Sequence, residues 1–329
     1  MAYLLRRTLF YLLAAAAAVV LNFTLPRLMP GDPATAMFAG FKDNLSPSDI
    51  VAMREAYGLS GGSLWSQFTD YLAHLVRGDL GTSLSQFPAP VTDVVGDGVG
   101  WTVLLGTTVV VIGFVLGAGL GMLSAWRQGS RFDSVVPPLT MLVGAFPYFF
   151  LALVSVYLLS VKWPLLPLGQ AYGLDVDPGW NIWFVSSAAE HLILPAGTVV
   201  LVSVGGWLLT MRNTMISVLD EDYLTLAHAK GLARSRVMGA YAARNAILPT
   251  VTTLGMAIGA VFSGQLLTEV VFSYPGVGHQ LYQAVTMHDY PLMQALFLII
   301  TLSLLLVNLL VDAVYVLLDP RVRSGSATA

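Results

Sequence analysis

The stretch GVGWTVLLGTTVVVIGFVLGAGLGMLSAW, Gly98–Trp126, contains no Asp, Glu, Lys or Arg. A bilayer core is crossed by about 20 consecutive apolar residues in a helix, so this stretch is long enough to span a membrane. A helix satisfies its own backbone hydrogen bonds, which lipid cannot do for it. The stretch therefore predicts a membrane-spanning helix, and with it the fold class of the chain.

Five further stretches without Asp, Glu, Lys or Arg have a comparable length: Thr8–Leu25, Ser134–Val161, His191–Met211, Asn245–Thr268 and Tyr290–Val311. The chain of 329 residues is 56% hydrophobic and 11% charged, whereas about a quarter of the residues of a soluble domain are charged. We therefore expect an all-α polytopic membrane protein with six transmembrane helices. The first stretch follows Arg6 and Arg7 and lacks a convincing cleavage site, so we expect an uncleaved anchor rather than a signal peptide.

Basic residues predict the orientation of these helices. With the N-terminus inside, the inner segments hold eleven of the sixteen Lys and Arg residues: Arg6, Arg7, Arg127, Arg131, Arg212, Lys230, Arg234, Arg236, Arg244, Arg321 and Arg323. The longer outer segments hold the other five, together with most of the acidic residues. Because cytoplasmic loops of membrane proteins carry an excess of Lys and Arg, both termini are expected in the cytoplasm.

The outer segment after the first helix, about residues 29–97, is too long for a simple turn. Ser46, Pro47 and Gly58 are typical of the start and end of a helix. Apolar residues at helical spacing predict a second helix from Leu64 to Val76, closed by Gly78. We expect a helical cap on the outer face. The chain then divides into an anchor helix (1–28), the cap segment (29–97), a transmembrane domain (98–318) and a cytoplasmic tail (319–329).

Small residues recur at four-residue intervals in two of the predicted helices: Gly113, Gly117 and Gly121, and Gly255, Gly259 and Ser263. Such spacing lets helix backbones approach each other closely in lipid. It indicates either packing within this chain or a subunit interface or pathway wall. Prolines near or in the apolar stretches predict kinked helices: Pro137, Pro138, Pro147 and Pro195.

A short basic stretch, LAHAKGLARSRVMGAYAARNAILPTV at Leu226–Val251, separates two long apolar runs. The acidic residues 220–222 precede it, where negative charge favours a helix start, and Gly231 is typical of the left-handed residue that ends a helix. We predict a short helix, a glycine turn and a second helix, with Leu248–Pro249 opening the fifth span. The open alternatives are that the cations only set the topology or bind anionic lipid headgroups, and that the short helix is an interfacial amphipath.

The same stretch carries a family resemblance. DYLTLAHAKGL (Asp222–Leu232), followed by RNAILPTVT (Arg244–Thr252), resembles the EAA loop of binding-protein-dependent ABC importer permeases, and more narrowly that of the oligopeptide/dipeptide/nickel permease family. Further motifs resemble that family in the same order along the chain: LMPGDP (Leu28–Pro33), GDLGTSL (Gly78–Leu84), TEVVFSYPGVGHQLYQAV (Thr268–Val285), DYPLMQA (Asp289–Ala295) and DPRVR (Asp319–Arg323). The chain departs from the usual family pattern at Thr225, Leu226 and His228.

The resemblance implies that the loop at 213–249 is a coupling loop. In such permeases the short helix before the glycine docks in a groove of a cytoplasmic ATPase subunit, and closure of the ATPases on ATP moves the spans. The residues expected to couple to the ATPase are Asp222, Tyr223, Leu226, Ala227, His228, Ala229, Lys230, Gly231 and Leu232. The residues expected at a gate or in the outer loop are Glu269, Tyr274, Pro275 and Gly276. For Glu269 a structural role in the turn is the alternative.

The resemblance also implies the partners: a second homologous permease subunit, two cytoplasmic ABC ATPase subunits, an extracytoplasmic solute-binding protein and the lipid bilayer of a bacterial inner membrane, but no nucleic acid. The chain has no G-x-x-x-x-G-K-[ST] phosphate loop. We therefore expect a non-catalytic subunit that binds no cofactor, with ATP and Mg bound by the partner ATPases. The family favours short peptides as the solute, with oligosaccharides or a metal chelate as alternatives.

Other chemistry has less support in the sequence. Without cysteine, the chain cannot form disulfides, thiolate metal sites or cysteine nucleophiles. His279, His288 and Asp289 are too widely spaced for a compact metal site, so none is expected. An intramembrane protease would need a His at membrane depth beside a serine such as Ser263, and a pore would need a filter sequence. Asp312 is expected to form a buried hydrogen-bonded pair with Asn308.

Overall fold

The computed structural model describes residues 2–28, 63–261 and 265–318. In these ranges the regular elements are helices, and an isolated bridge joins Thr82 to Pro90. The predicted helix after Ser46 and the tail 319–329 lie outside the described residues, as do most of LMPGDP and Ser263. The side chain of Asp312 is also outside them, so its pairing with Asn308 stays a prediction.

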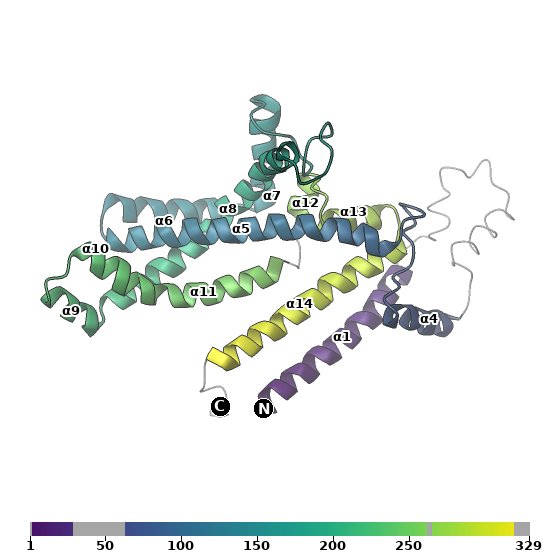
Figure 1. Ribbon diagram of the computed structural model, residues 1–329, viewed down its shortest axis with the longest axis horizontal. Coiled ribbons are helices and arrows are strands. Elements are labelled where there is room, and N and C mark those ends of the chain that lie inside the picture. Colours follow the sequence, from purple (N-terminus) through teal and green to yellow (C-terminus); the bar gives the residue numbers. More distant parts are fainter. Residues whose placement is uncertain (1, 29–62, 262–264, 319–329) are drawn as a thin grey trace. The chain divides into compact units, whose positions relative to one another are not determined.

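The chain forms two compact units, which are described separately (Figure 1). Unit one comprises residues 1–102, 262–266 and 275–329, and unit two comprises residues 103–261 and 267–274. The long helix α5, Val91–Trp126, contributes its residues up to Thr102 to unit one and the remainder to unit two.

Unit one is built on two long apolar helices, α1 (Ala2–Leu28) and α14 (Tyr290–Leu318), which pack against each other. The short helix α4 (Leu64–Val76) packs on α1 through aromatic rings: the ring centroids of Phe23 and Phe68 lie 5.0 Å apart. The bounds predicted for α4 are confirmed. Ser63 caps its start by accepting from the backbone N–H of Ser66, and Gly78 follows its end with a φ of +75°.

A buried carboxylate joins two loops of unit one. Asp289 accepts hydrogen bonds from the hydroxyl of Ser83 (2.6 Å) and from the backbone N–H (2.9 Å) and hydroxyl (2.8 Å) of Ser85. Its other oxygen accepts from the N–H of Leu292 in the first turn of α14. The motifs GDLGTSL and DYPLMQA, far apart in sequence, are therefore held together. Beside them, helix α13 (Val277–Thr286) packs its buried residues on the first turns of α5 and on α14.

Unit two is organised around α8 (Ile182–Leu219), the longest helix in the described part of the chain. Helices α6, α7 and α11 all pack against α8. The further elements are α6 (Arg131–Gly144), α7 (Tyr148–Val156), the π-helix η2 (Tyr157–Lys162), α9 (Asp222–Ala229), α10 (Arg234–Arg236), the π-helix η3 (Val237–Ala242), α11 (Ala243–Ala260) and α12 (Leu266–Val271).

Four described helices are long and apolar enough to cross a membrane: Arg6–Thr24, Val91–Trp126, Ile182–Leu219 and Tyr290–Leu310. A fifth span is counted if α6 and α7–η2, which bend by 91° at their junction, form one broken span. The multi-span helical class is thus confirmed for the described residues. The remaining stretch, Asn245–Thr268, is helical over α11, but residues 262–264 lie outside the described part of the chain, so a count of six stays a prediction.

The apolar stretch Ser134–Val161 forms two helical segments, because the chain turns between Gly144 and Tyr148, at Pro147, one of the prolines that were predicted to kink a helix. Pro147 precedes α7 and has no N–H to donate. Helical backbone is also disfavoured at the residue before a proline, which here is Phe146. Other prolines do not break their helices. Pro249, which was predicted to open a span, lies inside α11, a helix that already begins at Ala243.

Two glycines bring the backbones of α5 and α8 into close approach. A Cβ atom at Gly117 would lie 2.9 Å from the carbonyl oxygen of Val204, and one at Gly121 would collide with that of Leu208. Real Cβ atoms essentially never approach backbone so closely. The interpretation of this glycine stripe as packing within the chain is therefore confirmed at these two positions. In the second stripe, Gly255 has open space around it within the chain.

We expect Gly121→Ala to lower the melting temperature of the purified protein, because a methyl group must push α8 away from α5. Overpacking of this kind costs about 1–3 kcal/mol. The matched control is Gly119→Ala on the same helix, where an added Cβ meets nothing within 4 Å. Thermal unfolding in detergent, followed by tryptophan fluorescence, measures both variants. Equal melting temperatures would contradict the close approach.

Candidate functional site

The predicted short helix of the basic loop is confirmed as α9, Asp222–Ala229. Asp222 lies in its first turn, where a negative charge stabilises the helix. Asp220, two residues before this helix, also caps the C-terminal end of α8, where its N–H donates to the carbonyl of Val218. Helix α8 thus continues past the apolar stretch that was used to predict it.

The glycine turn is confirmed as well. Gly231 has a φ of +73°, the left-handed conformation that glycine adopts without steric cost. The N–H of Leu232 reaches back to the carbonyl of Ala227 at 3.4 Å, which is the long bond of a Schellman helix end. Leu232 also packs against the apolar cluster to which Ala227 belongs. The turn therefore fixes the direction in which the chain leaves α9.

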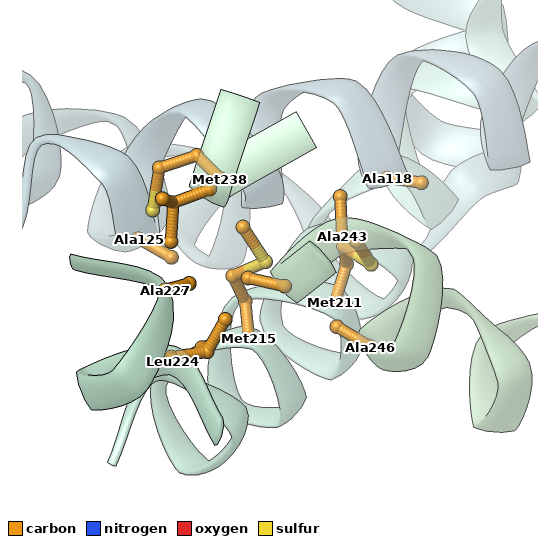
Figure 2. Packing of buried hydrophobic residues seen from close by; sticks show 11 residues of the cluster. Ala118, Ala125, Met211, Met215, Leu224, Ala227, Met238, Ala243 and Ala246 are labelled. Carbon is orange, nitrogen blue, oxygen red and sulfur yellow. The ribbon is translucent and has the colours of Figure 1, made fainter. Parts of the chain in front are cut away.

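Helix α9 has two different faces. Leu224 is 1% exposed and Ala227 is buried, both within an apolar cluster that includes Met211 and Met215 of α8 and Ala125 of α5 (Figure 2). On the other face Tyr223 and Leu226 are 39% and 56% exposed. Asp222, Ala229 and Lys230 are exposed as well, whereas the side chain of His228 lies outside the described part of the structure. One face thus anchors the helix and the other is available to a partner.

The anchor residue Leu224 was missed by the sequence analysis, which named residues of the resembling motif instead. A signal for it was present, because Leu224 and Ala227 are three residues apart and such residues share one face of a helix.

Two further hydrogen bonds fix the loop to its surroundings. The Asn245 side-chain amide of α11 donates to the Tyr223 hydroxyl at 2.7 Å, and Arg234 of α10 donates to the carbonyl oxygen of Trp126, the last residue of α5, at 3.3 Å. The predicted second helix is confirmed as α10, η3 and α11 in succession. Its middle part is a π-helix whose residues Val237 and Met238 are buried against the same cluster.

A charged cluster lies at the same end of α5 and α8. Asp133, in the first turn of α6, accepts from Nε of Arg212 at 2.6 Å and from its Nη2 at 2.9 Å. It also accepts from the Ser124 hydroxyl of α5 at 2.5 Å and from the backbone N–H of Gly129 at 3.0 Å. The sequence analysis counted Arg212 only as a topology residue, since nothing local in the sequence pairs it with an aspartate on another helix.

The outer-loop candidates divide between the two units, so they do not form one described site. Glu269 and Tyr274 belong to unit two and are fully buried. The Tyr274 N–H donates to the Glu269 carbonyl at 2.8 Å, closing a turn in which Ser273 has a φ of +47°. Burial raises the pKa of the Tyr274 phenol, and the charge of Glu269 adds to the effect. A backbone turn is present here, while both roles expected for Glu269, in a gate or in capping the turn, stay predictions.

The other two outer-loop candidates, Pro275 and Gly276, lie in unit one. Gly276 precedes α13 as its N-cap, and its carbonyl accepts from the N–H of Gln280 at 3.0 Å. Among the described residues, no group of three or more His, Asp or Glu side chains lies close enough together to hold a metal ion.

A pocket of about 400 Å³ in unit two is lined by the loop Pro167–Leu174, by His191 of α8 and by Val271–Ser273. The loop is held in place at three points. The hydroxyl of Ser160 donates to the Pro167 carbonyl, the N–H of Gln170 donates to the Phe272 carbonyl, and the N–H of Gly173 donates to the hydroxyl of Ser187. No Asp, Glu, Lys or Arg side chain lines this pocket.

The fold and the loop define a multi-span membrane protein that presents one short helix on a tightly packed helical platform. The chain belongs to the family described as the binding-protein-dependent transport system inner membrane component, which matches residues 117–324. It is similar to the dipeptide transport system permease protein DppB of Escherichia coli (strain K12), with 32% identity over 98% of both chains.

Two further relatives have similar names. The oligopeptide transport system permease protein AppB of Bacillus subtilis (strain 168) is 30% identical, over 98% of this chain and 99% of the relative. The di/tripeptide transport system permease protein DppB of Pseudomonas aeruginosa (strain UCBPP-PA14) is 31% identical, over 92% of this chain and 93% of the relative. The resemblance that was inferred from the motifs is thereby confirmed at the level of the family.

The two faces of α9 predict opposite outcomes for two leucines. Leu224→Ala leaves a cavity in the cluster and is expected to destabilise the protein by about 2–5 kcal/mol. Leu226→Ala removes an exposed side chain and is expected to change stability by no more than about 0.5 kcal/mol. Melting temperatures in the same detergent compare the two variants. A larger loss for Leu226→Ala than for Leu224→Ala would show that the faces are assigned the wrong way round.

Proposed function

We propose that the chain is a transmembrane permease subunit of an ABC importer for short peptides. It forms half of the translocation pathway and couples ATP hydrolysis by separate ATPase subunits to uptake of a peptide delivered by a solute-binding protein. Family membership supports the importer class, and the printed names of the relatives, which refer to dipeptide, oligopeptide and di/tripeptide transport, support the solute class.

The proposed architecture has six spans with both termini in the cytoplasm, a helical cap at 29–97 on the outer face, and a coupling helix between spans four and five. The excess of Lys and Arg in the segments assigned to the inside supports this orientation. The chain itself is non-catalytic. ATP and Mg are bound by two ATPase partners, and a second homologous permease completes the pathway.

The two-faced packing of α9 is the observation that carries the coupling role. A helix that transmits movement must contact the ATPase on one side and be fixed to the membrane helices on the other. Tyr223 and Leu226 offer the exposed side, and Leu224 and Ala227 join α9 to α5 and α8. Because packed helices move as rigid bodies rather than deforming continuously, a shift of α9 by an ATPase displaces the helices on which it is anchored.

Co-purification tests the proposal directly. The tagged chain is extracted from its native membranes in mild detergent, with an ATP analogue to trap assembled complexes, and the proteins that come with it are identified by mass spectrometry. We expect ATPase chains, a second multi-span permease and a binding protein that carries a short peptide. Recovery of the chain alone, or as a homo-oligomer, would contradict the importer role. An oligosaccharide or metal chelate in the binding protein would contradict only the solute class.

Gly231 provides a second prediction, at the turn that sets the direction of α9. An added Cβ meets nothing within 4 Å, so substitutions there act through the positive φ alone. A β-branched residue is a severe outlier in this conformation, whereas asparagine is accepted at helix ends of this kind. We expect Gly231→Val to abolish peptide uptake without loss of membrane insertion, and Gly231→Asn to retain uptake.

The control for Gly231 is Gly239→Ala in η3, where an added Cβ also meets open space and φ is not positive. Uptake in cells, normalised to the amount of protein in the membrane, compares the three variants. Normal uptake in Gly231→Val would show that the geometry of the turn is not needed for coupling.

A further inference from the structure

The carboxylate of Asp133 is the point at which three helices of unit two are joined by hydrogen bonds. It comes from α6, and it binds Arg212 of α8, Ser124 of α5 and the backbone N–H of Gly129 in the turn between α5 and α6. The Asp133 and Arg212 side chains are only 7% and 22% exposed. The two guanidinium bonds are parallel, which is the most specific geometry for an Arg–carboxylate pair.

Stability alone is a weak explanation for this pair. Partly burying two charges costs desolvation free energy, and apolar residues of similar volume often stabilise a structure as well or better. In some proteins such pairs instead select one arrangement of the elements that they join. Only 11% of the residues of this chain are charged, and two of these charged residues form this contact.

The pair lies next to the platform that holds α9, which is the apolar cluster formed by α5, α8, η3 and α11. Ser124 precedes Ala125 and Arg212 follows Met211, and both Ala125 and Met211 belong to the cluster that buries Leu224 of α9. On the loop side, Arg234 donates to the carbonyl of Trp126, two residues after Ser124. Ser124 and Arg212, which bind α6 through Asp133, are therefore direct neighbours in the chain of Ala125 and Met211, which pack against α9.

At its other end α6 is held to α8 by close backbone approach. An added Cβ at Gly144 of α6 would lie 3.0 Å from the carbonyl oxygen of Val202, and one at Gly205 of α8 would lie 3.1 Å from that of Thr140. The helix is thus fixed to α8 by glycine packing at its C-terminal end and by the ion pair at its N-terminal end. Beyond Gly144 the chain turns by 91° into α7.

We propose that Asp133 and Arg212 are positioning residues for energy coupling: their bridge makes α6 move with α5 and α8 when α9 is displaced, and thereby carries the displacement to α7. This rests on the proposed importer function. Without the bridge, α9 still docks and ATP is still hydrolysed, but the N-terminal end of α6 no longer follows the platform.

The test uses the complete complex reconstituted in proteoliposomes, and measures peptide imported per ATP hydrolysed. Asp133→Asn and Arg212→Gln each remove one charge, and the double variant removes both. We expect each single variant to lower the transport-to-hydrolysis ratio by about five-fold or more, the lower limit of a typical coupling effect. The double variant is expected to be no worse than the singles, since residues that act as a pair are not additive.

Arg212→Lys, which keeps the charge, is expected to recover part of the ratio that Arg212→Gln loses. The matched control is Arg131→Gln, an exposed arginine two residues from Asp133, which is expected to keep the wild-type ratio. A wild-type complex without ATP-driven uptake would overturn the proposed function itself. If the wild-type complex couples and the Asp133→Asn complex has the same transport-to-hydrolysis ratio per assembled complex, only the role of the bridge is overturned. A change in the melting temperature of the variant would not alter that conclusion.

A distance measurement reports the motion directly. Because the chain has no cysteine, spin labels can be attached without background labelling at Val135→Cys, near the N-terminal end of α6, and at Ser217→Cys on α8, two exposed positions. With Arg212 and Asp133 intact, we expect one α6–α8 distance through the ATP cycle, and with Asp133→Asn a second distance in the ATP-bound state. A single unchanged distance in the assembled, ATP-bound Asp133→Asn complex would overturn the proposal.

Discussion

The close approach of α5 and α8 at Gly117 and Gly121 is the constraint on which the rest of unit two depends. Any side chain at these positions would meet the backbone of α8, so the glycines set how near the two helices lie. That distance in turn defines the apolar platform that receives α9, η3 and α11. In lipid, where burying apolar surface gives no net gain between helices, such contact by small residues is a main source of association.

Local signals in the sequence account for most of the elements. Apolar runs predicted the long helices, and the bounds of α4 and the left-handed turns at Gly78 and Gly231 followed from capping residues and glycine. Prolines were less informative. Pro147 marks a sharp turn, whereas Pro195 and Pro249 lie inside continuous helices. The difference is set by packing against neighbouring helices, and that is not written within a few residues of the proline.

Local signals in the sequence also predicted part of the candidate site. The position and turn of α9 could be inferred from its charges and glycine, and the family from its motifs. The polar contacts between distant elements could not be inferred, because they join residues far apart in sequence: Asp133 and Arg212 in unit two are separated by 79 positions, and Ser83 and Asp289 in unit one by 206. An aspartate near a helix start is ordinary on its own, and only the folded chain shows which cation or hydroxyl it meets.

The opposite faces of α9 have a consequence for how such a subunit can change. The residues that pack the helix on α5 and α8, Leu224 and Ala227, are different from the exposed residue Leu226, while Tyr223 is partly exposed and also hydrogen-bonded to Asn245 of α11. Since specificity is a difference in affinity between competing partners, under the proposed function an exchange of Leu226 would select another ATPase while the internal packing stays as it is. Under the proposed function, partner choice and force transmission therefore depend on different side chains among the eight residues of α9.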